Sequence, residues 1–240
     1  MAAETESPSS VGDGIVVGTQ WTYAGDVSDH FDDHVARSVP FYHKGHELVA
    51  QLSDFFVHPC GVVYDIGCST GALAAGLAAR HPRGHVVAID LEPRMAAKAR
   101  QRCAGVCNVE VVEADATRVE FERSDLVVLY YTLQFIRPGE RQPLIDALHA
   151  SLNDGGALVM FEKVRASDAG LQDLMQQLYW EFKLTNGFSA HEIISKSRSL
   201  KSVLEPFTSE ANAQLLRRAG FQSVTTIQKY VCFEGMLAIK

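Results

Sequence analysis

The residues best suited to chemistry lie in a glycine-rich turn and in an acid that follows it. The turn at 67–71 comes directly after the apolar run Val62–Ile66, and an alanine-rich stretch, Ala72–Arg80, follows the turn. Asp90 ends the next apolar run, 19 residues after Gly71. That is close to the spacing at which a dinucleotide fold places the acid that binds a ribose diol. The pattern therefore predicts strand, glycine loop, helix and strand, with Asp90 accepting hydrogen bonds from two vicinal hydroxyls.

The loop differs from the dinucleotide fingerprint in its length and in its second glycine. It reads G-C-S-T-G, one residue shorter than G-x-G-x-x-G, and Ser69 stands in place of the second glycine. A pyrophosphate fits such a loop less well than the amino-acid tail of an adenosine does. We therefore expect S-adenosyl-L-methionine, rather than NAD, as the cofactor.

The same five residues also match G-x-S-x-G, the nucleophile elbow of α/β-hydrolases. His149 and His191 lie downstream and would be the candidate bases of such a site. A hydrolase has no use for an acid at the end of the next strand, whereas an adenosine site needs Asp90. We prefer the cofactor site, and keep the hydrolase and an ordinary tight turn without a ligand as alternatives.

Length and composition favour a globular enzyme over a nucleic-acid or membrane protein. The chain has 240 residues, 47% of them hydrophobic, and a formal net charge of -7. That suits one large domain or a core with a lid, and the negative charge argues against a nucleic-acid partner. No run approaches the roughly 18 apolar residues that a membrane helix needs. The five cysteines form no C-x-x-C pair, which indicates reduced thiols and a cytoplasmic location.

Apolar runs alternate with amphipathic stretches through most of the chain and predict an α/β fold, a Rossmann-like doubly wound sheet with a helical cap. We expect a disordered leader at 1–18 and a single domain at 19–240, with an N-terminal helical lid at 19–57 and a helical cap at 166–219 before the last two strands. The expected strands are 62–66, 85–90, 109–112, 125–131, 157–161, 224–228 and 230–239, and the expected helices are 43–57, 72–81, 92–103, 138–152, 171–182, 191–204 and 209–219.

Ligands of an open parallel sheet bind outside the carboxyl ends of the strands, at the point where the strand order reverses. Asp90 would bind the ribose hydroxyls, and Asp115 the adenine amino group. Asp65, just before the loop, would orient the cationic end of the methionine part. The residues expected at these strand ends are Asp65, Gly67, Cys68, Ser69, Asp90, Leu91, Asp115, Ala116, Tyr130 and Tyr131.

Methyl transfer from a sulfonium requires little of the side chains beyond holding the nucleophile close and in line. A base is needed only where the acceptor must lose a proton. Candidate bases are Glu162, Tyr131, His43 and His191, and the sequence does not rank them, so the catalytic residues stay unknown.

Two histidine pairs lie before the glycine loop. His30 and His34 have i, i+4 spacing, and His43 and His46 follow closely. A metal site there is conceivable, but a solvated helix face explains the spacing more simply. We therefore expect no metal.

Beyond these local patterns, the chain resembles the carboxy-S-adenosyl-L-methionine synthase family, a branch of the class I methyltransferases. The resemblance covers most of 21–240. The matching segments are Trp21-Thr22-Tyr23, Arg37-Ser38-Val39-Pro40 with Tyr42, 63–69, 132–135, 140–142, 155–159, Glu162-Lys163, Phe182-Lys183, Asn186-Gly187-Phe188-Ser189 and Ala219-Gly220-Phe221.

This resemblance implies a homodimer, prephenate as the carboxyl source, and a product that serves wobble-uridine modification in tRNA. It also implies ligand contacts at matching positions. Together with the strand-end acids and the loop, the predicted cofactor-binding residues are Tyr42, Asp65, Gly67, Cys68, Ser69, Gly71, Asp90, Leu91, Asp115, Ala116 and Tyr130, and the predicted substrate-binding residues are Tyr42, Tyr131 and Arg198.

Two positions differ from the family. The family has an asparagine at the end of the fourth strand, where this chain has Tyr130. It also has an arginine, supplied across the dimer, that binds the extra carboxylate of the ligand. The aligned position is Ser197, and Arg198 follows one residue later, which on a helix turns the side chain by about 100°.

These differences lead us to expect an S-adenosyl-L-methionine-dependent methyltransferase that acts on a small-molecule acceptor, in specialised metabolism. The alternative is a carboxy-S-adenosyl-L-methionine synthase, which a local gap that restores Arg198 would support. A non-catalytic protein that only binds the cofactor is the third interpretation.

Overall fold

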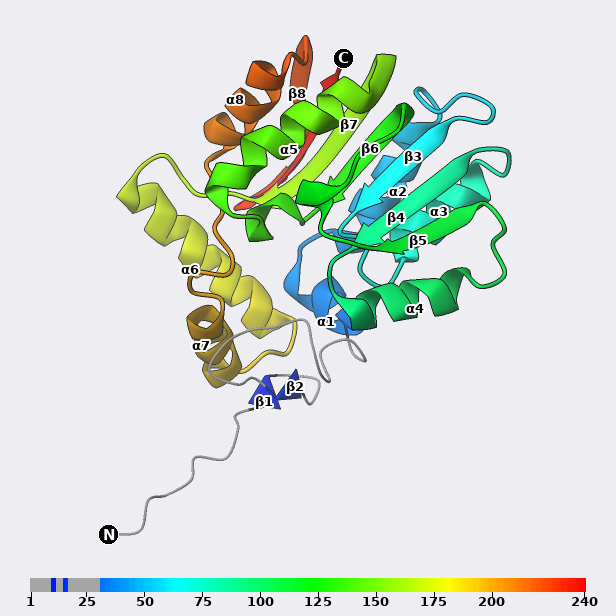
Figure 1. The fold of residues 1–240 in the computed structure, drawn as a ribbon. Coiled ribbons are helices and arrows are strands. Elements are labelled where there is room, and N and C mark those ends of the chain that lie inside the picture. Colours follow the sequence, from blue (N-terminus) through cyan, green and yellow to red (C-terminus); the bar gives the residue numbers. More distant parts are fainter. Residues whose placement is uncertain (1–9, 12–14, 17–30) are drawn as a thin grey trace.

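The computed structural model describes residues 10–11, 15–16 and 31–240. Within the predicted leader it describes two short antiparallel strands, β1 (Ser10–Val11) and β2 (Ile15–Val16). The rest of the predicted leader and the first part of the predicted lid lie outside the described residues, so the boundary at 18 stays a prediction. Residues 31–240 form an α/β fold around one sheet (Figure 1).

The sheet has seven strands in the order β5-β4-β3-β6-β7-β9-β8. Strands β3 to β7 run parallel, β9 is antiparallel to β7, and β8 is antiparallel to β9. The strand order reverses between β3 and β6. The doubly wound sheet and its closing antiparallel pair are thus confirmed. The strands are β3 (Val62–Ile66), β4 (His85–Asp90), β5 (Val109–Glu113), β6 (Ser124–Tyr130), β7 (Leu152–Lys163), β8 (Ser223–Tyr230) and β9 (Phe233–Ile239).

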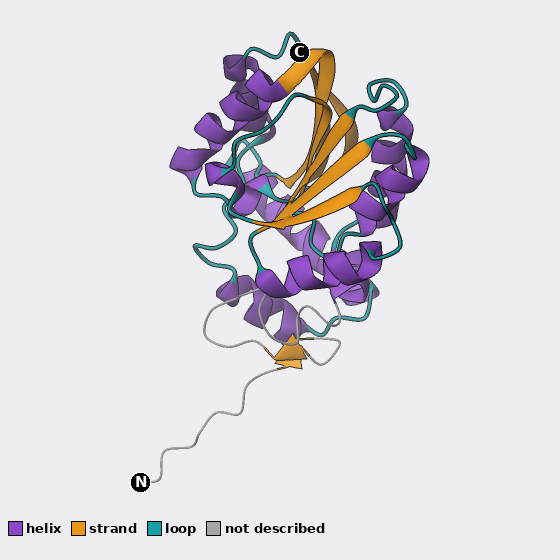
Figure 2. Cartoon of the chain, turned by 45° about the vertical axis from the view of Figure 1, so that its right-hand side comes forward, coloured by secondary structure: helices purple, strands orange, loops and turns teal. Residues whose placement is uncertain are grey.

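Helices cover both faces of the sheet (Figure 2). Helices α5 and α8 pack on one face through Leu144, Leu148 and Leu216. Helices α2, α3 and α4 pack on the other through Val49, Leu77 and Ala99. Every residue of β6 is buried, as expected for a central parallel strand. The helices are α1 (Phe31–Ser38), α2 (Tyr42–Ser53), α3 (Ala72–Arg80), α4 (Pro93–Cys103), α5 (Pro138–Ser151), α6 (Ala169–Thr185), α7 (Ala190–Ser199) and α8 (Ser209–Ala219).

Three predicted boundaries are wrong by four or more residues. Helix α2 ends at Ser53, not at Val57. Strand β7 begins at Leu152, not at Ala157, because Leu152 already pairs with Ser124 of β6, and a register shift separates this pair from Leu126 and Ala157. Helix α7 ends at Ser199, not at Leu204. The residues after it form turns and a loop instead. No described helix combines the length and apolarity needed to cross a bilayer.

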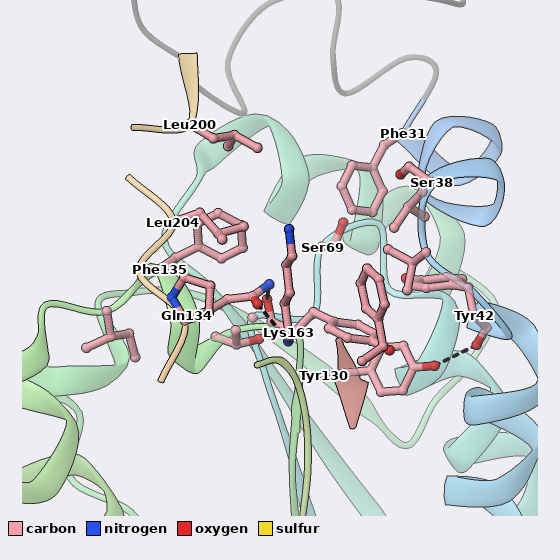
Figure 3. Close-up of a pocket in the computed structure, with 18 of the residues that line it drawn as sticks. Phe31, Ser38, Tyr42, Ser69, Tyr130, Gln134, Phe135, Lys163, Leu200 and Leu204 are labelled. Carbon is pink, nitrogen blue, oxygen red and sulfur yellow. Dashed lines mark hydrogen bonds between the residues drawn. The ribbon is translucent and has the colours of Figure 1, made fainter. Parts of the chain in front are cut away.

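Helices α6 and α7 lie apart from the helices that cover the two faces of the sheet, beyond the carboxyl ends of the strands (Figure 1). They are tied to α1: the Tyr179 hydroxyl donates to the Ser38 carbonyl oxygen at 3.0 Å, and Arg37 Nε donates to the Asn186 carbonyl oxygen at 3.1 Å. The Arg37 guanidinium also lies 4.7 Å from the Phe188 ring centre. A cavity opens between these helices and the sheet (Figure 3).

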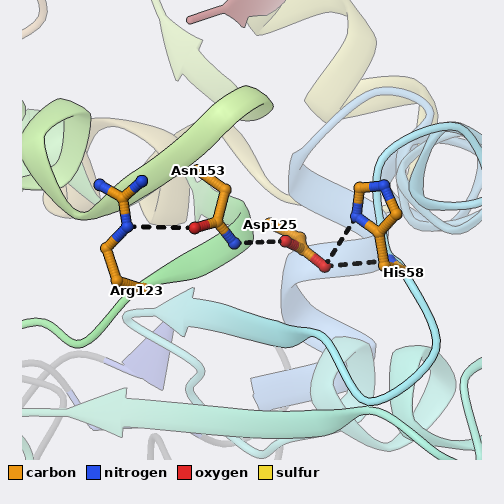
Figure 4. Close-up of polar contacts among 4 residues, drawn as sticks. All are labelled: His58, Arg123, Asp125 and Asn153. Carbon is orange, nitrogen blue, oxygen red and sulfur yellow. Dashed lines mark hydrogen bonds and ion pairs between the residues drawn. The ribbon is translucent and has the colours of Figure 1, made fainter.

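A polar network fastens the opposite end of the sheet (Figure 4). Asp125, at the start of β6, is 3% exposed. It accepts hydrogen bonds from the backbone N–H of His58 at 2.9 Å and from Asn153 Nδ2 at 2.7 Å, and Arg123 Nε donates to Asn153 Oδ1 at 3.1 Å. One carboxylate thus joins the loop before β3 to strands β6 and β7.

Replacing Asp125 by alanine removes the buried carboxylate that accepts from the His58 backbone N–H and from Asn153 Nδ2. We expect Asp125→Ala to lower the free energy of unfolding by roughly 2–4 kcal/mol, measured by urea denaturation. Arg123→Ala is the control, because its exposed side chain should contribute less than about 1 kcal/mol. Equal losses in both variants would contradict the role given to Asp125.

Candidate functional site

A cavity of about 980 Å³ lies at the carboxyl ends of the parallel strands, at the point where the strand order reverses. Helices α1, α6 and α7 contribute its outer wall. Its volume is at the upper end of the range for small-molecule sites. Most of the predicted site residues line it, namely Tyr42, Asp65, Gly67, Cys68, Ser69, Asp90, Leu91, Asp115, Ala116, Tyr130 and Tyr131.

The glycine loop is held against the end of β4. The backbone N–H groups of Gly67 and Cys68 both donate to the Ile89 carbonyl oxygen, at 2.7 and 3.0 Å. Gly67 has φ of 74°, and a Cβ atom there would lie 2.3 Å from Thr132 Oγ1. Only glycine therefore fits this position.

Asp90 holds the loop as well as facing the cavity. Its Oδ2 accepts from the backbone N–H of Ser69 at 2.7 Å, and its Oδ1 accepts from that of Glu92 at 2.9 Å. Burial raises the pKa of the Asp90 carboxyl. Each carboxylate oxygen can accept a further hydrogen bond, so the carboxylate still has acceptor capacity for a diol.

Asp65 is a buried carboxyl group with one oxygen that accepts no hydrogen bond from the described residues. It is 1% exposed, and the oxygen concerned is Oδ2. Burial, followed by the nearby Asp90 charge, raises the pKa of Asp65 to about 7. An ammonium group from a ligand would supply the missing partner. The residues present therefore fit the amino-acid end of S-adenosyl-L-methionine.

Asp115 lies at the end of β5 and is tied to its own turn. Its Oδ1 accepts from the backbone N–H of Thr117 at 3.0 Å and from the Thr117 hydroxyl at 2.7 Å. These hydrogen bonds lower the pKa of Asp115. The carboxylate therefore stays ionised beside Ala116, at the place predicted for the adenine.

Aromatic side chains form another wall of the cavity. The Tyr130 hydroxyl donates to the Tyr42 carbonyl oxygen at 2.6 Å (Figure 3), so Tyr130 fixes the start of α2. The Tyr42 and Tyr131 rings stack with centres 6.5 Å apart. The Tyr131 hydroxyl is buried and has no hydrogen-bond partner among the described residues.

Two predicted site residues do not line the cavity. Gly71, with φ of 75°, begins α3, and a Cβ atom there would lie 3.0 Å from Ala99. Its place is thus explained by helix packing. Arg198 is exposed on α7, whereas Ser197 lines the cavity.

The residue patterns missed a group of cations. Five basic side chains line the cavity, from the end of β7, from the cap helices and from the loop after α7. Lys163 ends a buried strand, and its side chain runs into the cavity (Figure 3). Its position at the carboxyl end of a parallel strand is the feature of the sequence from which Lys163 could have been predicted as a site residue. The five are Lys163, Arg165, Lys183, Lys196 and Lys201.

The histidine interpretation is wrong for His34. It is buried, and its ring packs on Phe188 with centres 5.3 Å apart, so it does not lie on a solvated face. His46 also lines the cavity, and His30 lies outside the described residues. No group of three or more metal-binding side chains occurs in the part of the chain that the structure describes.

The hydrolase alternative is excluded by the surroundings of Ser69. The Ser69 hydroxyl lies 3.6 Å from Met95 Sδ. His149 packs on Phe221 instead, and His191 is exposed on α7, next to Ser195. Neither histidine can act as a base for this hydroxyl.

Of the candidate bases, Glu162 is buried outside the cavity lining. It accepts from the backbone N–H of Leu133 at 2.9 Å, and burial raises its pKa to about 8. His43 and His191 are exposed. Only Tyr131 among the four candidates lines the cavity.

Comparison with known proteins identifies the class. A family model described as a methyltransferase domain matches residues 63–156. The S-adenosylmethionine-dependent methyltransferase SibL superposes with a TM-score of 0.59 at 17% identity, covering 83% of this chain and 55% of that one. An O-methyltransferase family protein from Burkholderia thailandensis gives 0.61 at 21% identity, covering 89% and 59%. The fold is that of the class I S-adenosyl-L-methionine-dependent methyltransferases.

Comparison with curated relatives identifies the family within this class. The chain is 34% identical to the carboxy-S-adenosyl-L-methionine synthase of Campylobacter lari, over 92% of this chain and 95% of the relative. It is 35% identical to that of Staphylococcus epidermidis, over 92% and 97%. The chain belongs to the carboxy-S-adenosyl-L-methionine synthase family. It is therefore an enzyme of the methyltransferase class with S-adenosyl-L-methionine as its cofactor, and the non-catalytic interpretation falls.

The pKa of Asp65 makes cofactor binding depend on pH. Asp65 is mostly protonated at pH 6 and mostly ionised at pH 8 in the free protein, while a ligand ammonium favours the ionised form throughout. We expect the affinity for S-adenosyl-L-homocysteine to rise about tenfold from pH 6 to pH 8, measured by calorimetry. The dependence should vanish in Asp65→Asn and persist in Asp173→Asn, an exposed control on α6. A flat wild-type profile would rule out an ammonium at Asp65.

Proposed function

We propose that this enzyme makes carboxy-S-adenosyl-L-methionine from S-adenosyl-L-methionine, with prephenate as the carboxyl donor. Membership of the synthase family supports this reading over methylation of a small molecule in specialised metabolism, the function favoured by the sequence. The proposal keeps the cofactor site at Asp65, Asp90 and Asp115 and changes the second substrate.

The distribution of charge in the cavity is the observation that carries the proposal. Acids line the side formed by β3, β4 and β5, at Asp65, Asp90 and Asp115. Apart from Glu205, the opposite side presents the five basic residues, which lie at or just after the end of β7, on α6 and α7, and in the loop after α7. A cationic ligand suits the first side and an anion suits the second. Prephenate carries two carboxylates, whereas methylation of a neutral acceptor gives no use for this basic wall.

The chemistry balances with these two reactants. Carboxylation replaces one C–H bond of the sulfonium methyl by a C–C bond, so the methyl gives up a proton and its electron pair attacks CO₂. Prephenate releases CO₂ and its ring hydroxyl, as hydroxide, when it aromatises to phenylpyruvate. The hydroxide and the methyl proton form water. The protein's part is to hold both reactants close and away from bulk solvent.

The basic wall also suits a second candidate function, methylation of an anionic acceptor. The products distinguish the two. We expect purified enzyme with S-adenosyl-L-methionine and prephenate to give phenylpyruvate and a cofactor product heavier by one CO₂, detected by mass spectrometry. Formation of S-adenosyl-L-homocysteine with an acceptor panel, and no carboxylated product, would instead favour the methyltransferase.

We further propose that the enzyme is a cytoplasmic homodimer. All five cysteines are unpaired, in keeping with a reducing compartment. Leu171, Leu174 and Leu178 are exposed at helical spacing on α6, and such an apolar stripe suits contact with a second copy. In this dimer Arg198, exposed on α7, would reach the cavity of the partner and bind the carboxylate of the product.

Disrupting the stripe tests the dimer. Leu174→Glu should convert the protein to a monomer in light scattering, because it buries a charge at the centre of the contact. Phe55→Glu is the control, since Phe55 is also exposed but lies beyond the end of α2. A dimeric Leu174→Glu variant, or a monomeric wild type, would contradict this interface.

A further inference from the structure

Two lysines of the basic wall share one aromatic ring. Lys163 Nζ lies 4.4 Å, and Lys183 Nζ 4.5 Å, from the centre of the Tyr179 ring. Lys163 comes from the end of β7 and Lys183 from α6, so the two ammonium groups meet between the sheet and the cap. Both line the cavity.

Neither ammonium has a carboxylate partner among the residues that the structure describes. Lys183 is 6% exposed, and burial, with Lys163 nearby, lowers its pKa to about 8. A buried ammonium without a counter-ion is costly, and a contact with an aromatic ring offsets only part of that cost. The missing negative charge must come from a ligand if both lysines are to be charged.

The Tyr131 hydroxyl is a third donor near the two lysine ammonium groups. The buried Tyr131 hydroxyl has no hydrogen-bond partner among the described residues. The rings of Tyr131 and Tyr179 both pack on Phe233, with centres 6.0 and 5.0 Å away. An unpaired hydroxyl and two unpaired ammonium groups thus border one corner of the cavity.

We propose that Lys163, Lys183 and Tyr131 form a carboxylate subsite for the second substrate, separate from the cofactor site. The ligand class is an organic carboxylate. Its identity as prephenate rests on the proposed function, but the subsite itself requires only an anion. The cofactor's own carboxylate is the competing occupant, and the test separates the two.

The test titrates prephenate into protein saturated with S-adenosyl-L-homocysteine, by calorimetry. Lys163→Met and Lys183→Met should each weaken prephenate binding at least tenfold, since each removes a desolvated charge from the contact. Affinity for S-adenosyl-L-homocysteine should stay within about twofold of wild type. Lys44→Met, at an exposed position on α2, should change neither affinity.

Melting of the ligand-free protein supplies the second readout. Because Lys183 is buried without a counter-ion, ligand-free Lys183→Met should melt at or above the wild-type temperature while it loses prephenate binding. Lys183→Arg keeps the charge and should retain most of the affinity. A lower melting temperature with unchanged prephenate binding would assign Lys183 a structural role and overturn the subsite.

Prephenate binding by the variants and product formation by the wild type distinguish failure of the subsite from failure of the proposed function. If both methionine variants weaken prephenate binding but the wild type forms no carboxylated product, the subsite stands and the synthase function falls. If the wild type forms that product and both variants keep its Michaelis constant for prephenate, the subsite falls alone. Loss of S-adenosyl-L-homocysteine binding in the variants, with prephenate binding unchanged, would place the cofactor's carboxylate at the lysines and overturn the subsite.

Discussion

Charge buried without a partner is the constraint around which this cavity is built. Among the residues that the structure describes, Asp65 Oδ2 has no hydrogen-bond partner on one side, and Lys163 and Lys183 have no carboxylate partner on the other. Each unpaired group destabilises the ligand-free protein. A scaffold tolerates such a cost where ligands remove it, and here the two signs call for two ligands of opposite charge. The rest of the architecture serves to keep these groups apart and out of water.

The cofactor half of the site could be predicted because its signals are local. The apolar run of β3, the loop that follows it and Asp90 at the end of β4 are close in sequence, and their spacing fixes their geometry. The same holds for the parallel sheet, whose strands alternate with helices. Gly67 shows how far local pattern reaches: its positive φ is expected of a glycine turn, but its contact with Thr132 is visible only in the fold.

The other half could not be predicted, because its residues meet through tertiary structure. Lys163 and Lys183 are separated by a loop and most of α6, and only Lys163, at the carboxyl end of a parallel strand, stands where a ligand is expected from the sequence. His34 was misjudged for the same reason: its helix is short, and the residue that buries it, Phe188, belongs to the distant cap. Helix α7 stops early because Leu200 and the loop after it turn back towards the cavity.

The structure changes the interpretation of the two positions, Tyr130 and Ser197, that differ from the family. Tyr130 replaces an asparagine, yet its hydroxyl is used to hold the backbone of Tyr42, so the change reshapes the wall rather than emptying it. Ser197 lines the cavity without a charge, and Arg198 is exposed and does not line it. From the sequence alone, the serine at this position indicated that recognition of the ligand carboxylate is lost. Basic groups from β7 and α6 also line the cavity, so an anion there would have cationic partners other than that arginine, and its absence no longer argues against a synthase.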